Sequence, residues 1–314
     1  MFGFAMQPDE IRPGLWLGGL GSLLHGNVYA HILSVIADSP YEPPATTKSH
    51  LTISVNDVPS AVLIRHFPAG IAFIKQGLEQ GGKVLVHCAA GVSRSATMVC
   101  AYLMATEGLS LEEAIVSVRE KRRVICPNQG FYAQLQLWEQ MGCKLDESNP
   151  TYRYYKTQQA GYNWTQSGTL DPNALAELKE DSQRTETVYR CKKCRRLIAT
   201  ESNTIPVPER IHQQLDPWRH PRSAPKETRD DPGEVGTSLF VEPLQWMQAE
   251  LDNAAIQGKL YCPGCSARLG SYNWAGIQSN SGVWMNPAFQ LHLNRLDLVN
   301  HAKTPILAVR KPKI

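Results

Sequence analysis

The sequence lacks a long run of apolar residues. No window holds enough consecutive apolar side chains to span a bilayer, so no membrane-spanning segment is expected. The opening residues, MFGFAMQPDE, lack a basic segment followed by an apolar stretch, so a secretory signal is not expected. The sequence also lacks a large excess of charge of one sign: 32 Lys and Arg residues and 29 Asp and Glu residues give a formal net charge of +3, which is not diagnostic of a nucleic-acid binder. These absences favour a soluble intracellular protein with no membrane partner.

Cysteine is present, but not in a pattern that calls for disulfides. Four of the eight cysteines stand alone in the first half of the chain: Cys88, Cys100, Cys126 and Cys143. The other four form two pairs, CKKC at 191–194 and CPGC at 262–265. A chain of 314 residues without an export signal does not need disulfide staples, and paired spacing suits a metal better.

The length of the chain, 314 residues, favours two domains, and the first half has the pattern of a compact α/β unit. Short β-rich runs occur at 31–37, 51–55 and 83–87. Apolar residues recur at helical spacing in the segments 71–80, 95–108, 110–122 and 127–142. Ser110 and Glu113 have the spacing of a capping box at the start of one of these helices. Residues 1–147 therefore predict a central, mostly parallel sheet flanked by helices.

The second half divides into segments of different composition. Residues 148–187 are rich in Tyr, Gln, Gly, Ser and Asp, which predicts a linker. Residues 188–303 contain both cysteine pairs and predict a small zinc-ribbon-like domain. Within it, the segment near 203–236 is too rich in proline and charge to pack well, so a mobile loop is expected. Residues 304–314 form a basic tail.

The segment VLVHCAAGVSRS, residues 84–95, places a cysteine and an arginine around a glycine where a strand leads into a helix. Successive backbone N–H groups at such a turn form a cradle for a dianionic phosphate. The arginine fork can hold two phosphate oxygens at once. The predicted phosphate-binding residues are Ala89, Ala90, Gly91, Val92, Ser93 and Arg94.

Cys88 is the predicted nucleophile of this loop. The positive field of a helix N-terminus with a cationic neighbour can lower a thiol pKa from about 8.5 to roughly 3.5–7.5. The resulting thiolate can attack a phosphate ester and form a phosphocysteine. Ser95 is placed to hydrogen-bond the sulfur and help it leave, and His87 to order the loop rather than to act as a base. A buried cysteine in an ordinary turn is the alternative.

This segment resembles the signature HCxxGxSRS of the cysteine-dependent dual-specificity protein phosphatases. The resemblance extends to EIRPGLWLGGL near the start, AYLMA after the loop and PNQGFYAQL near the end, so it covers residues 9–142. It implies hydrolysis of phosphotyrosine and phosphoserine/threonine in proteins, with no cofactor for that chemistry.

The reaction also requires a group that protonates the leaving alcohol or phenol. Asp57, in ISVNDVP, follows a predicted strand, and on the residues alone it is equally an ordinary solvated aspartate. The resemblance favours Asp57 as the general acid over its rival Asp38. Asn128 has two interpretations as well: it helps to position the phosphate loop, or it is a plain helix cap.

The two CxxC pairs predict a metal site in the second half. Two thiolates that bracket a tight turn form a knuckle, and two knuckles provide the four ligands of a closed structural zinc site. The ligands are expected to be Cys191, Cys194, Cys262 and Cys265. Reduced unpaired thiols are one alternative. A redox pair is another, disfavoured because neither pair opens a helix in a thioredoxin-like context.

The second half resembles one subfamily of these phosphatases through YRCKKCRRLIAT, FVEPLQWM, CPGCSARLGSYNWAG and PAFQLHLNRLD. In that subfamily a second set of metal ligands is common, and here its positions are occupied by Val207, Gly236, Ser279 and Ser281. The resemblance therefore implies a single zinc ion. His212 and His220 are available as substitute ligands, although solvated loop histidines are the simpler interpretation.

The same resemblance implies a binding role beside the enzymatic one. The subfamily is associated with maturation of the large ribosomal subunit, on the pre-60S particle, where a placeholder protein is exchanged for the ribosomal stalk. Basic clusters at 192–196 and 310–313 are candidates for contacts with rRNA, or are simply solvated surface. Location in the cytoplasm and the nucleus is expected, and catalysis is dispensable in the alternative that the protein acts mainly as an assembly factor.

Overall fold

The chain folds into two compact units, Met1–Asp146 and Glu147–Ile314. The computed structural model describes residues 7–23, 29–37, 43–178, 186–207, 238–279 and 282–300. The predicted tail at 304–314, and residues 208–236 of the predicted mobile loop, lie outside these ranges. Within the described ranges, no helix combines the length and the apolar character that crossing a membrane requires.

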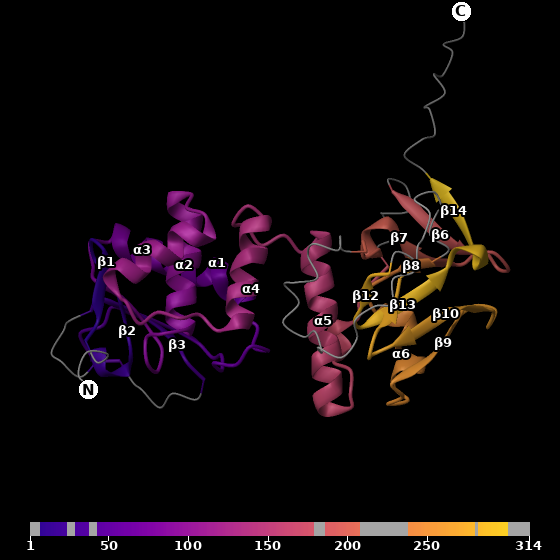
Figure 1. The fold of residues 1–314 in the computed structure, drawn as a ribbon, viewed down its shortest axis with the longest axis horizontal. Helices are drawn as coiled ribbons and strands as arrows, with labels where there is room; N and C mark the ends of the chain where they lie inside the picture. The colour runs from indigo at the N-terminus through magenta and orange to yellow at the C-terminus, as the bar shows by residue number, and fades with distance from the viewer. Residues whose placement is uncertain are drawn as a thin grey trace, which may run out of the picture. The chain divides into compact units, whose positions relative to one another are not determined.

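The first unit contains a five-stranded sheet with the strand order β1-β2-β5-β3-β4 (Figure 1). Its strands are β1 (Asp9–Arg12), β2 (Leu15–Gly18), β3 (His31–Val35), β4 (Ser49–Ile53) and β5 (Val84–His87). Strands β2, β5, β3 and β4 are parallel, and β1 pairs antiparallel with β2 at the edge. The mostly parallel sheet is therefore confirmed, with two N-terminal strands added to the three expected from the sequence.

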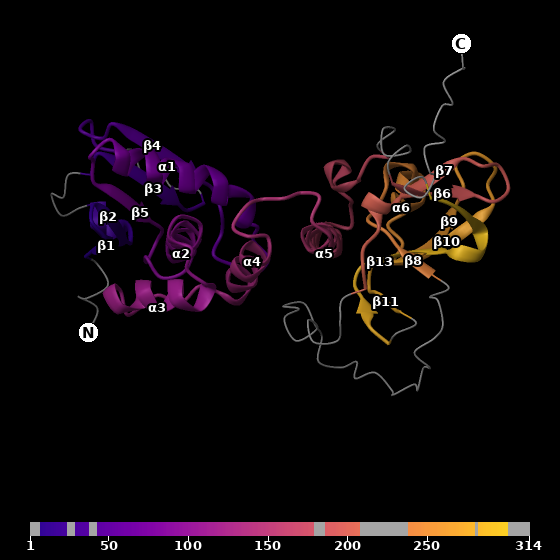
Figure 2. The same ribbon diagram turned by 90° about the horizontal axis from the view of Figure 1, so that it is seen from above.

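Helix α2 lies at the centre of the helical layer and packs against α1, α3 and α4 (Figure 2). The helices of this unit are α1 (Phe67–Glu79), α2 (Arg94–Glu107), α3 (Leu111–Lys121) and α4 (Gln129–Gln140), with short 3₁₀ turns at Leu20–Leu23 and Ile64–His66. From Arg94 to Met104, every side chain of α2 except Tyr102 is buried. Because protein surrounds α2 along most of its length, its N-terminus is held in a fixed position.

The ends of these helices carry the signals read from the sequence. The predicted capping box is confirmed at α3, where the Ser110 hydroxyl accepts a hydrogen bond from Glu113 N–H and the Glu113 carboxylate accepts one from Ser110 N–H. Gly108 ends α2 in the left-handed region, with φ of 69°. Local sequence therefore specifies where these helices begin and end.

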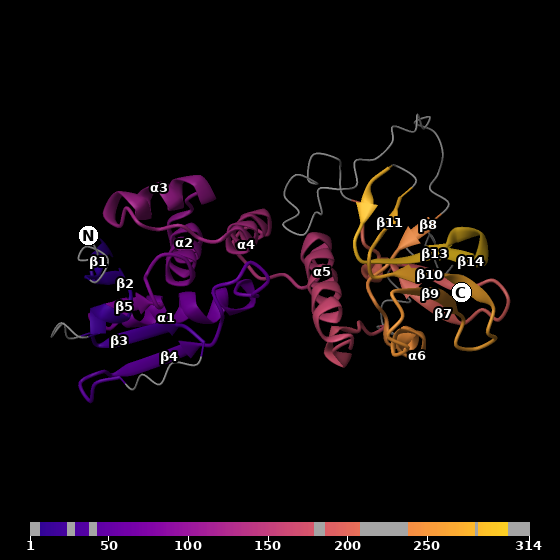
Figure 3. The same cartoon turned by 60° about the horizontal axis from the view of Figure 1, so that its bottom comes forward.

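The second unit is built mainly from three antiparallel sheets (Figures 1 and 3). One has the order β14-β6-β7, the second β8-β13-β10-β9, and the third is the pair β11-β12. The strands are β6 (Thr187–Cys191), β7 (Leu197–Thr200), β8 (Ser238–Phe240), β9 (Gln257–Tyr261), β10 (Arg268–Asn273), β11 (Ile277–Gln278), β12 (Trp284–Met285), β13 (Ala288–His292) and β14 (Leu296–Asn300). Short helical turns connect them at Pro172–Ala174 (η3), Glu201–Asn203 (η5), Gln245–Met247 (η7), Gln248–Leu251 (α6) and Leu293–Arg295 (η8).

The segment expected to be a linker contains an 18-residue helix, α5 (Pro150–Ser167). Trp164 of this helix is buried in the core of the second unit and stacks on Trp274, with ring centroids 5.0 Å apart. The expectation of a linker is therefore wrong for these residues. A weakly apolar helix can belong to a domain when one large aromatic side chain anchors it to the core.

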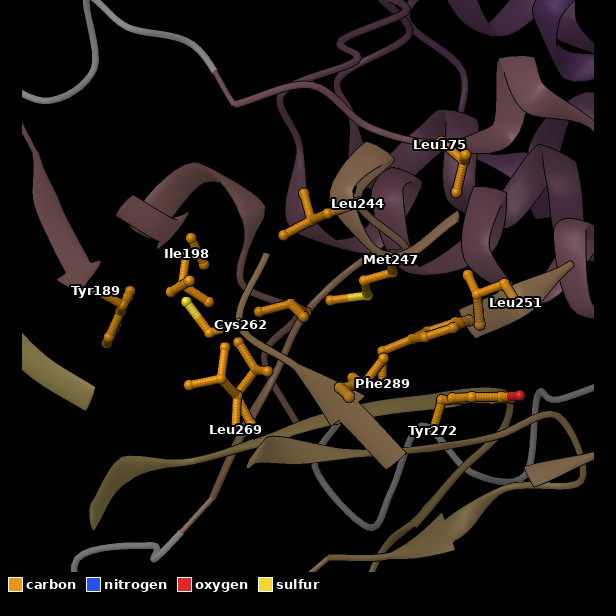
Figure 4. Packing of buried hydrophobic residues seen from close by; sticks show 14 of the residues in the cluster. Leu175, Tyr189, Ile198, Leu244, Met247, Leu251, Cys262, Leu269, Tyr272 and Phe289 are labelled. Atoms are coloured by element: carbon orange, nitrogen blue, oxygen red, sulfur yellow. The ribbon is translucent and has the colours of Figure 1, made fainter. Parts of the chain in front are cut away.

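The core of the second unit includes two of the four paired cysteines, Cys191 and Cys262. Figure 4 shows Cys262 among Ile198 and Leu269, with Met247 and Phe289 further along the same cluster. Cys265 packs against the same cluster, whereas Cys194 is exposed, so three of the four paired cysteines contact the apolar core.

Candidate active site and metal centre

The predicted phosphate loop lies between the end of β5 at His87 and the start of α2 at Arg94. Strand β5 has β2 on one side and β3 on the other, both parallel to it. The loop thus emerges at the carboxyl end of the central strand, where ligands bind in open parallel sheets.

The carbonyl groups of the loop are all engaged by donors outside it. Leu20 N–H donates to Ala89 O at 3.0 Å, Cys126 N–H to Val92 O at 2.8 Å and Thr97 N–H to Ser93 O at 2.8 Å. The remaining two, Ala90 O and Gly91 O, accept from the side chain of Arg122 at 3.1 and 2.8 Å. Because peptide carbonyl and N–H groups point in opposite directions, the N–H groups of this loop are left to face inward.

Gly91 is required at its position by both conformation and space. Its φ is +70°, in the left-handed region that side chains rarely adopt. A Cβ atom there would lie 2.4 Å from the carbonyl carbon of Gly18, so even alanine would push β2 away from the loop.

The sulfur of Cys88 is buried and receives hydrogen bonds. The Ser95 hydroxyl donates to Sγ at 3.2 Å and the Gly91 N–H donates at 3.3 Å. Burial raises the pKa of Cys88, but the Ser95 side chain and the backbone N–H groups of Ser95, Gly91 and Val92 lower it more, so the pKa lies below its ordinary value. These contacts favour the thiolate.

Arg94 and Asp57 face each other beside the loop. Arg94 Nε lies 3.5 Å from Asp57 Oδ2, and Arg94 Nη1 donates to Val55 O at 3.1 Å. The Arg94 side chain is 10% exposed and that of Asp57 is 33% exposed, so the carboxylate lies nearer to solvent than the guanidinium. The rival acid, Asp38, lies outside the described residues.

Ser93 and Asn128 hold the same carboxylate oxygen. The Ser93 hydroxyl donates to Asp57 Oδ1 at 2.7 Å and Asn128 Nδ2 donates to it at 2.9 Å. Asn128 also caps α4, since its Oδ1 accepts from Phe131 N–H at 3.0 Å. Both interpretations of Asn128 thus describe contacts that it makes, and the Ser93 hydroxyl was not anticipated from the sequence.

His87 is buried at the end of β5 and takes part in a chain of hydrogen bonds. Its Nε2 lies 2.6 Å from Ser34 Oγ, which lies 2.8 Å from His50 Nε2. Its Nδ1 lies 3.4 Å from Cys88 O. Burial lowers the pKa of His87 to about 4, so the imidazole is neutral near pH 7.

Arg122, which follows α3, is the main contact that the sequence did not reveal. This side chain is 2% exposed. Besides the two loop carbonyls, it donates to Gln7 O at 3.0 Å and to Asp9 Oδ2 at 2.7 Å. The run Lys121-Arg122-Arg123 contains no signal that the middle residue alone is buried.

The four paired cysteines converge in the second unit. Their sulfur atoms all lie within 4.8 Å of one another. Sγ of Cys191 lies 3.7 Å from that of Cys265, and Sγ of Cys194 lies 3.5 Å from that of Cys262. Zn–S distances of about 2.3 Å give tetrahedral S–S distances of about 3.8 Å, which these separations fit closely.

The two knuckles share one backbone geometry. Cys191 N–H donates to Arg196 O at 2.8 Å, while Arg195 N–H donates to Cys191 O at 2.8 Å. In the other knuckle Cys262 N–H donates to Ala267 O at 2.9 Å, and Ser266 N–H donates to Cys262 O at 2.9 Å. The residue four positions after the first cysteine has a positive φ in both, 65° at Arg195 and 55° at Ser266. Such repetition indicates two matched halves of one site.

The thiols differ in their readiness to ionise. The Arg196 N–H lowers the pKa of Cys194 to about 7, whereas burial raises the pKa of Cys262 to about 12. Four sulfurs this close repel one another as thiolates unless a cation neutralises them. The cluster therefore could hold a metal ion, and among the described residues it is the one group of three or more such ligands.

Of the four positions that correspond to the subfamily's second set of metal ligands, Val207 and Ser279 are among the described residues, and neither is a common zinc ligand. Val207 is exposed, and Ser279 is buried, with its N–H donating to Val283 O. Gly236, Ser281, His212 and His220 lie outside the described residues.

Comparisons with known proteins agree with this geometry. Residues 23–141 match the family described as dual specificity phosphatase, catalytic domain. The chain is 35% identical to the mouse (Mus musculus) "Dual specificity protein phosphatase 12", over 97% of this chain and 92% of that protein. It is 32% identical to the "Tyrosine-protein phosphatase YVH1" of Saccharomyces cerevisiae, over 95% and 94% of the two chains.

Among solved structures, the human "tyrosine phosphatase-like serine/threonine/tyrosine-interacting protein" is 36% identical. That likeness covers 43% of this chain and 96% of the other, with a TM-score of 0.41. The matches to the mouse and yeast proteins span 97% and 95% of this chain, so they extend over both units. The chain belongs to the dual specificity protein phosphatases, a family of cysteine-based protein phosphatases.

Proposed function

We propose that this chain hydrolyses phosphotyrosine and phosphoserine/threonine in proteins through a phosphocysteine intermediate. The observation that carries this proposal is the outward engagement of all five carbonyl groups from Ala89 to Ser93, together with the backbone N–H groups of Gly91, Val92 and Ser95 that stabilise the sulfur of Cys88. A loop arranged in this way stabilises the negative charge of a bound phosphate and of the thiolate beneath it.

In the first step the Cys88 thiolate attacks phosphorus, the S–P bond forms and the bond from phosphorus to the leaving oxygen breaks. Arg94 binds two phosphate oxygens. Its Nε contacts Asp57 Oδ2 at 3.5 Å but has no hydrogen-bond partner among the described residues, so a phosphate oxygen would give this donor a hydrogen bond.

Asp57 gives a proton to the leaving oxygen in the first step and takes one from water in the second. Water then attacks phosphorus, the S–P bond breaks and the sulfur leaves as a thiolate. The Ser95 hydroxyl, 3.2 Å from the sulfur, stabilises that leaving thiolate. Neutral His87 orders the loop through its contact with Cys88 O and needs no role as a base.

We propose that the four-cysteine cluster holds one structural zinc ion. Cys191, Cys194, Cys262 and Cys265 supply four sulfur ligands, which suits a closed site without an open position for substrate. Zinc would join β6 to the end of β9 and so stabilise the second unit. The phosphatase chemistry needs no metal.

We further propose that the second unit binds the pre-60S ribosomal particle, where a placeholder protein is exchanged for the stalk, and that the protein occurs in the cytoplasm and the nucleus. The side chains of Lys192, Lys193 and Arg196 are exposed around the first knuckle and could contact rRNA phosphates. The second basic cluster, Arg310, Lys311 and Lys313, lies outside the described residues. In the alternative, binding is the main role and catalysis is dispensable.

One experiment separates these roles. The tagged protein, its Cys88→Ser variant and its Lys193→Glu/Arg196→Glu variant are sedimented on ribosomal gradients and assayed for hydrolysis of a phosphotyrosine peptide. Cys88→Ser should lose hydrolysis and keep co-sedimentation, and the charge-reversed variant should do the opposite. Hydrolysis by the Cys88→Ser variant would refute the catalytic proposal. Unchanged co-sedimentation of the charge-reversed variant would refute the rRNA contact.

A further inference from the structure

A pocket of about 230 Å³ opens on the second unit, outside the four-cysteine cluster. Four residues line it: Arg268, His292, Asn294 and Arg295. Arg268 begins β10, His292 ends β13, and the other two belong to the 3₁₀ turn that precedes β14. The pocket therefore lies where regular elements of two sheets meet, and no long loop contributes to it.

The lining groups carry positive charge or donate hydrogen bonds. Neither Arg268 nor Arg295 forms an ion pair with any described residue. Asp297, the acidic residue nearest to Arg295 in the sequence, is paired with Arg195 instead. Burial, followed by the positive charges of Arg268 and Arg295, lowers the pKa of His292, so both guanidinium groups act on the imidazole. Both arginines are exposed, so solvent moderates the repulsion between these cations, and a bound anion would offset what remains.

The pocket is held in shape by the first knuckle. Lys192 N–H donates to Arg295 O at 3.1 Å, and Lys192 Nζ donates to Asn294 O at 3.2 Å. On the other side, β10 and β13 are joined by a ladder from Gly270 and Leu291 onward. A binding site built on fixed backbone loses little entropy when a ligand arrives.

We propose that this pocket binds the phosphomonoester group of a phosphorylated protein segment, at a position separate from the catalytic loop. A phosphomonoester has three terminal oxygens and close to two negative charges near pH 7. Two arginine forks and a histidine offer the matching number of donors, as in other Arg clusters that recognise phosphorylated segments.

A nucleic-acid backbone fits the pocket less well. Each phosphodiester has two terminal oxygens and one charge, and binding accumulates along a track of cations rather than in one compact group. The exposed Lys193 and Arg196, assigned above to rRNA, do not line the pocket. The site thus goes beyond the proposed hydrolysis, because it would give the second unit a phosphate-dependent contact of its own.

The test measures binding to the full-length Arg94→Met chain, in which the catalytic loop has lost its arginine. A degenerate pool of phosphoserine peptides and its unphosphorylated counterpart are titrated, alongside inorganic phosphate and a single-stranded RNA. The phosphorylated pool should bind more tightly than the unphosphorylated pool and inorganic phosphate. Adding Arg295→Gln should weaken its binding at least about tenfold, because a charged bidentate contact is lost.

Lys259→Gln is the matched control. It removes one exposed positive charge outside the pocket, from the sheet that also contains Arg268 and His292, and it should leave binding unchanged. Zinc content and tryptophan fluorescence confirm that each variant is folded, and Arg295→Lys should restore binding only in part. Four results would overturn the proposal: no loss with Arg295→Gln, an equal loss with Lys259→Gln, equal binding of inorganic phosphate, or RNA binding without peptide binding. Hydrolysis of p-nitrophenyl phosphate by the Arg295→Gln chain with Arg94 intact should be unchanged, so failure of this site is distinguishable from failure of the catalytic proposal.

Discussion

Arg122 Nε donates a hydrogen bond to the carbonyl oxygen of Gly91 at 2.8 Å, inside the first unit. The same guanidinium reaches Ala90 O and the carboxylate of Asp9. One buried side chain thus orients the middle of the phosphate loop. Its positive charge is neutralised by the carboxylate of Asp9 in the first strand. Arg122 is a positioning residue, because it acts on the loop from outside and touches no substrate.

Replacing Arg122 by Met should lower kcat/KM by about 10- to 100-fold, which corresponds to roughly 1.4–2.7 kcal/mol of transition-state stabilisation, because two loop carbonyl groups lose the donor that orients them. The exposed neighbour Arg123 provides the control, since Arg123→Met removes the same charge and should change little. Steady-state kinetics on a phosphotyrosine peptide measures the loss. The pH dependence of Cys88 alkylation reports the thiol pKa, and so shows whether the loop still stabilises the thiolate. A folded Arg122→Met variant with an unshifted profile would contradict the positioning role.

The Ser95 hydroxyl should contribute measurably to the thiolate of Cys88. A hydrogen bond to a charged group is worth about 1.5–3 kcal/mol, so its loss should change the pKa of Cys88 measurably. Removal of a donor that lowers the pKa must raise it, so in Ser95→Ala the thiolate fraction at a given pH falls. The rate of iodoacetamide alkylation should therefore reach its midpoint at a higher pH.

Ser93→Ala is the matched control for that measurement. The Ser93 hydroxyl donates to Asp57 rather than to the sulfur, so its loss should leave the alkylation midpoint where it is. If both serine variants shifted the midpoint equally, the effect would come from general loosening of the loop and not from the contact between Ser95 and Cys88.

The first unit could be predicted from sequence because its signals are local. The loop chemistry, the capping box at Ser110 and the glycine that ends α2 are each written in a few consecutive residues. The edge strand β1 could not be found in this way, since DEIR has no strong strand pattern, and its position depends on pairing with β2. Burial of Arg122 is likewise a tertiary effect that no local pattern reveals.

Helix α5 was missed because its apolar residues are few and weakly periodic. Its ends nevertheless carried usable signals: Asn149 accepts hydrogen bonds from Thr151 and Tyr152 N–H, Pro150 occupies the first turn, and Gly168 ends the helix with φ of 68°. An Asn-Pro pair followed by a glycine a helix length later is better evidence than composition alone.

Asp57→Asn should separate substrates by their leaving group. An alkyl or phenyl ester needs a proton on the departing oxygen, so kcat should fall by about 10²-fold or more, whereas an ester of an acidic phenol should lose far less. Asparagine keeps an acceptor for Ser93 and Asn128, so the local contacts are largely preserved. Parallel assays of phenyl phosphate and p-nitrophenyl phosphate provide the comparison, and an equal loss for both would remove Asp57 from its assigned role.

Metal content and chelation test the four-cysteine cluster. Elemental analysis should give one zinc per chain, and Cys262→Ser should lose it, whereas Cys143→Ser, outside the cluster, should keep it.

Because Cys191 and Cys262 belong to the apolar core, removing the ion should unfold the second unit, which limited proteolysis can follow. Activity of the first unit should persist under reducing conditions, since Cys88, Arg94 and Asp57 belong to the first unit and all four ligands to the second. Two zinc ions per chain would show that groups other than Val207, Gly236, Ser279 and Ser281 complete a second site. Loss of activity on chelation with Cys88 still reduced would show that the active site depends on the second unit.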